Sequence, residues 1–165
     1  MTNIPSVSVV MSVFNNEKFL SQSIKSILDQ SHTNFEFIIV DDGSNDGSKK
    51  IIEDWVKIDN RIIFINRSTN MGLPFSLNEA LSIAKGNYIA RMDSDDISTV
   101  NRLQKQLRFL EANPEIDILG GQVSHIDSNG IEFKYSRMPL SFDDIKSIAE
   151  FACPIVHPTY MVKKK

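Results

Sequence analysis

The sequence predicts a single α/β domain built on a parallel sheet with helices on both faces. The main support is a repeated order: a short β-branched run is followed by apolar residues at helical spacing, four times in succession. Composition agrees, because 41% of the 165 residues are hydrophobic and 24% are charged, which suits a folded core. In addition, no apolar run approaches the roughly 20 residues that span a bilayer.

Each expected strand is an apolar run, and each expected helix carries one apolar stripe. The expected strands are, in order, residues 7–13, 35–40, 61–66 and 88–92. The expected helical stripes are, in order, residues 20–28, 51–56, 77–84 and 100–110. Gly86 follows the third stripe as a C′ residue, and Asn113-Pro114 ends the fourth.

The pattern changes after Pro114. Two short strand-like runs flank Asn129-Gly130, which predicts a hairpin. A helix is expected around residues 142–149, and the strand-like "CPIVHPTYMV" follows it. Because the chain stops directly after that run without a closing helix, we expect residues 1–165 to be part of a longer protein.

Charge and cysteine content exclude several classes of protein. The net charge of −3 and the pI near 5.6 give no basic face for nucleic acid. Cys153 is the single cysteine, which excludes an internal disulfide and a CxxC metal site. The N-terminus lacks a signal peptide, so we expect a soluble cytoplasmic protein. The terminal three lysines are only a weak membrane signal, and nothing in the sequence indicates an oligomeric state.

Polar clusters follow the four expected strands. They are "FNNE" at 14–17, "DDGS" at 41–44, "NRSTNMG" at 66–72 and "DSDD" at 93–96. Ligands of open parallel sheets bind outside the carboxyl ends of the strands, so we expect the four clusters to meet at one rim.

Ordinary structural roles remain open for several of these residues. Candidate helix caps are Asn15 or Asn16, Asp46 or Ser48, and Asp96 or Ser98. Gly72 suits either a tight turn or a close backbone approach to a ligand. Adjacent carboxylates at Asp41 and Asp42 are costly at a buried strand end unless a donor binds them. A nucleobase N–H or a ribose hydroxyl could be that donor.

Capping explains at most one residue of "DSDD". Asp93 and Asp95 form an Asp-x-Asp pair after a buried strand, opposite a second aspartate pair. Mg²⁺ and Mn²⁺ commonly bind through one or two carboxylates together with substrate phosphates. We therefore expect one of these side chains to bind the ion and the other to brace ribose or metal-bound water.

Five ordered blocks of the chain resemble the family 2 nucleotide-sugar glycosyltransferases. The blocks are residues 7–31, 35–48, 70–81, 86–96 and 157–162. The resemblance implies the GT-A fold, a Rossmann-like three-layer sandwich with a mostly parallel central sheet. It also implies that residues 1–165 form one nucleotide-sugar-binding domain, truncated at its acceptor-side end.

The resemblance implies roles for matching residues. Those expected to line the nucleotide-sugar are Ser12, Val13, Phe14, Asn15, Glu17, Asn70, Gly72 and Asn78. Asp42 would hydrogen-bond the base, usually uracil, and Arg91 and Met92 would lie beside the ribose and phosphates. Asp93 and Asp95 match the Asp-x-Asp, with Asp95 expected to coordinate Mn²⁺ or Mg²⁺ directly.

The implied reaction is transfer with inversion from a UDP-linked sugar to an acceptor hydroxyl. The acceptor would be a saccharide or lipid-linked, in cell-surface polysaccharide or glycolipid assembly at the inner face of a membrane. Two departures from the family stand out. Leu77 replaces the arginine that often precedes the position of Asn78, and no acidic pair follows His157, so the catalytic base is expected beyond Lys165.

Two other enzyme classes are disfavoured because their glycine-rich motifs are missing, and one non-catalytic class stays open. A nucleotidyltransferase needs a glycine-rich phosphate loop after the first strand, and "FNNEKF" has no glycine. A dinucleotide-dependent dehydrogenase needs G-x-G-x-x-G there, which is also missing. A receiver-like module or a nucleotide-binding remnant without transfer activity remains an alternative.

Overall fold

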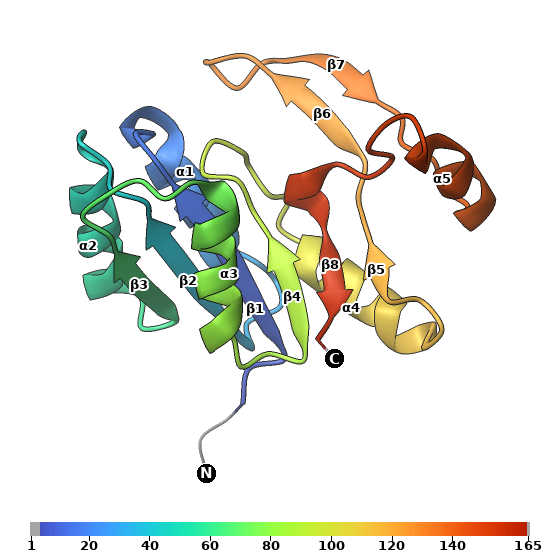
Figure 1. Ribbon diagram of the computed structural model, residues 1–165, viewed down its shortest axis with the longest axis horizontal. Coiled ribbons are helices and arrows are strands. Elements are labelled where there is room, and N and C mark those ends of the chain that lie inside the picture. The colour runs from blue at the N-terminus through green and yellow to red at the C-terminus, as the bar shows by residue number, and fades with distance from the viewer. Residues whose placement is uncertain (1–3, 165) are drawn as a thin grey trace.

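The computed structural model describes residues 4–164 and is centred on a six-stranded sheet (Figure 1). Its strand order is β3-β2-β1-β4-β8-β5. The strands are β1 (Val7–Val13), β2 (Phe35–Asp41), β3 (Ile62–Asn66), β4 (Tyr88–Arg91), β5 (Ile118–Leu119) and β8 (Met161–Lys163). The first four are mutually parallel, and β8 runs antiparallel to both β4 and β5. The expected α/β class with a mostly parallel sheet is confirmed.

Helices cover both faces of this sheet (Figure 1). They are α1 (Glu17–Leu28), α2 (Ser48–Ile58), α3 (Leu73–Ile83) and α4 (Arg102–Ala112). Successive strand residues point to opposite faces. Met11 accordingly packs in the core cluster that contains Leu20 of α1 and Leu103 of α4. Val10 packs in a second cluster with Ala80 of α3. The strands are therefore buried on both faces, as continuous apolar runs predict.

The remaining elements belong to residues 123–159, and Figure 1 shows the hairpin above the sheet and α5 on the side of β5. They are the hairpin strands β6 (Val123–Ile126) and β7 (Glu132–Ser136), α5 (Phe142–Ala149) and the 3-10 helix η1 (His157–Thr159). Gly130 has a φ of 80° in the hairpin turn, as the Asn129-Gly130 pair predicts. None of the helices within residues 4–164 has the length and apolarity needed to cross a membrane.

Gly86 does not have the predicted role of C′ residue. The helix α3 ends at Ile83 with Ala84 as its C-cap, and Gly86 lies two residues further on. A Cβ atom on Gly86 would lie 2.5 Å from the backbone nitrogen of Ser8 and 2.6 Å from the carbonyl carbon of Val7. The glycine is therefore required by close packing of the α3–β4 connection on β1, not by helix termination.

Candidate functional site

The carboxyl ends of β1, β2, β3 and β4 meet at one rim, so the four polar clusters are brought together as predicted. Val13 at the end of β1 is in register with Asp41 at the end of β2. Asp41 is in register with Asn66 at the end of β3. Arg91, the last residue of β4, pairs with Val10 on the other side of β1.

The loops after β1 and β2 are joined by hydrogen bonds. The amide of Asn15 donates to Ser44 Oγ (3.0 Å), and the amide of Asn45 donates to Asn15 Oδ1 (2.8 Å). The amide of Gly47 donates to Glu17 Oε2 (2.5 Å). Asn15 has a φ of 49°, the left-handed region that asparagine tolerates. The side chains of Asn15 and Glu17 therefore fix the second loop, a role that the sequence did not reveal.

Asp46 links the starts of two helices. Its Oδ2 accepts from the amide of Glu17 and its Oδ1 from the amide of Ser48, each at 3.0 Å. Burial raises the pKa of Asp46, but hydrogen bonds from Ser48 and Glu17 lower it below its ordinary value. Asn16 is the N-cap of α1 without a capping side-chain bond, and its Nδ2 donates to Ser94 Oγ instead (2.7 Å). That bond ties the first loop to the "DSDD" segment.

Asp42 is buried, with 1% of its surface exposed, and accepts hydrogen bonds from two backbone amides and one guanidinium. The donors are the amide of Met71 (3.0 Å), the amide of Gly72 (2.7 Å) and Arg67 Nη1 (3.1 Å). Burial would raise the pKa of Asp42, but the two amides and Arg67 hold it below its ordinary value. Asp42 thus holds the "NMG" loop against the end of β2.

Arg67 is a site residue that sequence reasoning missed. Besides Asp42, its Nε donates to Glu79 Oε2 (2.7 Å) and its Nη1 to Ser76 Oγ (3.2 Å). These bonds connect the end of β3 to helix α3. The available signal was an arginine in the cluster after β3, because a buried carboxylate on the neighbouring strand requires such a donor.

Three aspartates form an acidic cluster after β4. Asp93, Asp95 and Asp96 each offer a carboxylate oxygen, and these oxygens all lie within 4.8 Å of one another. Burial, and then the charges of Asp93 and Asp95, raise the pKa of Asp96. Arg91 Nη2 lies 2.5 Å from Asp93 Oδ1 and is the cluster's ion-pair partner. Three converging carboxylates with excess negative charge are a donor set that fits Mg²⁺ or Mn²⁺.

The predicted cap at the start of α4 is wrong. The N-cap is Asn101, so Asp96 and Ser98 both lie before it. Ser98 Oγ accepts from Gln30 Nε2 at 3.2 Å, which joins this segment to the end of α1. Asp96 is left as a member of the acidic cluster.

The other predicted site residues differ in how exposed their side chains are. The side chains of Val13 and Met92 lie in the apolar core, with 0% and 2% of their surface exposed, so only their backbone can face a ligand. Phe14, Asn70 and Asn78 are exposed, and Ser12 is partly buried.

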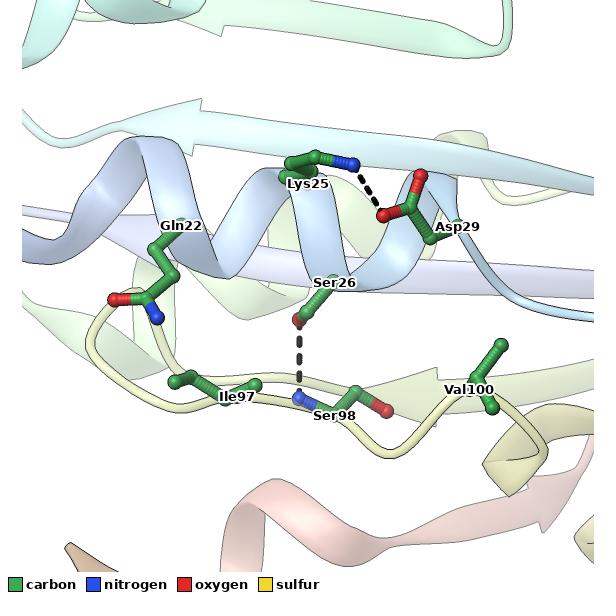
Figure 2. Close-up of a pocket in the computed structure, with 7 residues that line it drawn as sticks. All are labelled: Gln22, Lys25, Ser26, Asp29, Ile97, Ser98 and Val100. Carbon is green, nitrogen blue, oxygen red and sulfur yellow. Dashed lines mark hydrogen bonds and ion pairs between the residues drawn. The ribbon is translucent and has the colours of Figure 1, made fainter. Parts of the chain in front are cut away.

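A shallow groove of about 310 Å³ lies elsewhere, between α1 and residues 97–100 (Figure 2). Its lining residues are Gln22, Lys25, Ser26, Asp29, Ile97, Ser98 and Val100. Lys25 pairs with Asp29, and the amide of Ser98 donates to Ser26 Oγ (3.0 Å), as Figure 2 shows. None of the predicted ligand residues lines this groove, so the rim of the sheet remains the candidate site.

Known proteins share both the sequence pattern and the fold. Residues 8–164 match the family model described as Glycosyl transferase family 2. An uncharacterized glycosyltransferase of Methanocaldococcus jannaschii is 43% identical over 98% of this chain and 57% of its own. The O-antigen biosynthesis glycosyltransferase WbnJ of Escherichia coli is 35% identical over 96% of this chain and 61% of its own.

A solved structure, residues 1–349 of TarS from S. aureus, superimposes with a TM-score of 0.74 at 25% identity. The match covers 95% of this chain and 46% of TarS 1–349. TarS 1–349 has also been solved in complex with UDP and with UDP-GlcNAc. The chain spans about half the length of the curated relatives it matches, at 57% and 58% for two of them.

Proposed function

The chain belongs to glycosyl transferase family 2, and from this premise we propose that it binds a nucleoside-diphosphate sugar together with a divalent cation. The observation that carries the proposal is the acidic cluster at the rim, with three carboxylate oxygens within 4.8 Å. A diphosphate and three carboxylates would repel one another strongly without a cation between them. A divalent cation would therefore reduce the repulsion both within the acidic cluster and between the cluster and the diphosphate.

Asp93 and Asp95 would hold the cation, with Asp95 in direct contact. When bound, Mn²⁺ or Mg²⁺ would neutralise the charge that gathers on the leaving nucleoside diphosphate. The residues proposed to line the nucleotide-sugar are Ser12, Val13, Phe14, Asn15, Glu17, Asn70, Gly72, Asn78, Arg91 and Met92. An ionised carboxylate offers about four acceptor positions. Asp42 is proposed to accept the imide N–H of uracil in addition to its bonds from Met71, Gly72 and Arg67.

The reaction proposed for the whole protein is transfer of the sugar with inversion to an acceptor hydroxyl. We propose that the base that deprotonates this hydroxyl lies beyond Lys165, as the family resemblance implies. The name of the O-antigen relative supports an acceptor in cell-surface polysaccharide or glycolipid assembly. We place the protein in the cytoplasm, where a lipid-linked acceptor would bring it to the inner membrane face.

Calorimetry with UDP, in the presence and absence of Mn²⁺, tests the donor site. We expect Mn²⁺ to strengthen UDP binding at least tenfold, and Asp95→Ala to abolish most of that gain, because charge-assisted contacts to the diphosphate depend on the cation. GDP and dTDP in place of UDP report which base is accepted.

Asp143→Ala is the matched control, because Asp143 is an exposed aspartate in α5, away from the rim. It should bind UDP and Mn²⁺ as the wild type does. A wild-type chain that binds none of the three nucleotides would favour a receiver-like module. An Asp95→Ala chain with undiminished Mn²⁺ dependence would refute the cation assignment.

A further inference from the structure

Arg91 carries hydrogen-bond donors that nothing within residues 4–164 accepts. The residue is 8% exposed, and its Nη2 forms the ion pair with Asp93. Its Nε and Nη1 atoms are buried and have no partner among the described residues. A buried guanidinium with free N–H groups is costly, so proteins rarely retain one without an acceptor to bind.

The backbone of Arg91 is fixed on both sides. Its amide donates to the carbonyl of Tyr160 (2.9 Å), and its own carbonyl accepts from Arg102 Nη2 (2.6 Å). The guanidinium itself lies beside the acidic cluster, because its Nη2 pairs with Asp93 and only 10% of the side chain is exposed. A planar guanidinium matches an oxyanion such as phosphate, to which it can donate two parallel bonds.

The ion pair with Asp93 also concerns the cation. Asp93 is one of the proposed cation ligands, and in this structure its Oδ1 is held by Arg91. A divalent cation that takes this oxygen weakens the ion pair and places a second positive charge beside the guanidinium. Both changes make the interaction of the Arg91 guanidinium with a new anionic partner more favourable.

We propose that Arg91 exchanges partners: it neutralises Asp93 until a divalent cation binds there, and its guanidinium then donates to the diphosphate of the donor. The inference rests on the proposed function and deepens it. It makes the binding of cation and diphosphate interdependent through a residue of the protein, in addition to any direct contact between the two ligands.

A binding cycle on Arg91→Met tests this exchange. Calorimetry gives the Kd of Mn²⁺ alone, of UDP alone, and of UDP at saturating Mn²⁺, and the ratio of the two UDP values is the coupling factor. We expect Arg91→Met to bind Mn²⁺ alone at least threefold more tightly, because the competing guanidinium is gone. We expect its coupling factor to fall at least threefold.

Arg61→Met is the matched control, because Arg61 forms a part-buried ion pair with Asp59 (2.6 Å) just before β3, at the opposite end of that strand from the rim. It should keep wild-type values in all three titrations. Uridine in place of UDP should show no coupling in any variant, since it lacks the diphosphate.

A wild-type coupling factor in Arg91→Met would overturn the exchange, and so would equal coupling with uridine. If Arg91→Met does not fold by circular dichroism, Arg91→Lys replaces it, because lysine keeps the charge but lacks the planar fork. A threefold or greater loss of coupling in Arg91→Lys supports the exchange, and no loss refutes it. A wild-type chain that binds none of UDP, GDP and dTDP would refute the proposed function itself, which separates the two failures.

Discussion

At the scale of single residues, the rim is organised by buried charges with specific partners. Asp42 receives hydrogen bonds from Met71, Gly72 and Arg67, so one carboxylate fixes the position of a neighbouring loop. The sequence indicated that this aspartate needed a donor. It did not indicate Arg67, because the two residues are 25 positions apart and meet only when β2 and β3 pair.

Asp42→Asn should destabilise the chain substantially. The amide has one acceptor oxygen, and its NH₂ group would face donors, which leaves buried N–H groups and a guanidinium without partners. We expect a loss of about 2–4 kcal/mol in the free energy of unfolding, measured by urea denaturation.

Asp54→Asn is the control for Asp42→Asn, because Asp54 is an exposed aspartate that pairs with Lys50 and Lys57. It should leave the urea midpoint unchanged. An Asp42→Asn midpoint equal to that of the wild type would show that the buried bonds contribute little.

Asp96 should make stability depend on pH in the sense opposite to Asp42. Its folded pKa is raised above the ordinary 3.8 by burial and by Asp93 and Asp95, so the folded chain binds this proton more tightly than the unfolded chain. The associated stability is present below about pH 3.8 and is lost as the pH rises through the folded pKa. Asp42, with its lowered pKa, contributes stability that is lost as the pH falls through its folded pKa.

Asp96→Asn should therefore stabilise the cation-free chain at pH 7. Removing one of three crowded charges should raise the thermal midpoint by roughly 2–4 °C, and the gain should shrink as the pH falls toward 4. Differential scanning calorimetry between pH 4 and 7 measures this difference. A gain of the same size at both pH values would show that charge repulsion is not its cause.

At the scale of elements, the sequence could predict the strands and helices because each has a simple physical signal. Strands buried on both faces are continuous apolar runs, and helices on a sheet show one apolar stripe. The joining of the first two loops could not be predicted, since it depends on Asn15, Glu17 and Asp46 meeting partners about 30 residues away. Sequence reasoning considered Asn15 and Asp46 as caps of their own helices and did not consider contacts between the loops.

Gly86 lies near the end of α3 and was predicted to terminate it, but its observed role is close packing on β1. Gly86→Ala should destabilise the chain by about 1–3 kcal/mol, because the new Cβ would overlap backbone atoms of β1 that cannot move aside. Gly121→Ala is the control, since its Cβ would lie 3.5 Å from Thr159, an ordinary contact. Urea midpoints of both variants test this, and equal midpoints would contradict the packing role of Gly86.

At the scale of the whole molecule, one sheet brings residues from four strand ends to a single rim. The fold class and the meeting of the four polar clusters at one rim were predictable from the sequence. Which side chains face a ligand was not, because Val13 and Met92 match the binding motif and yet lie in the core. A motif predicts where the backbone of a residue lies, whereas the direction of its side chain depends on packing.

The measurement that tests the central claim most directly is anomalous diffraction at the manganese edge from crystals grown with UDP and Mn²⁺. We expect the strongest anomalous peak at bonding distance from carboxylate oxygens of Asp95 and Asp93, with the diphosphate reaching the same ion. A manganese peak away from these aspartates, or UDP bound on another face of the molecule, would contradict the assignment of the rim as the donor site.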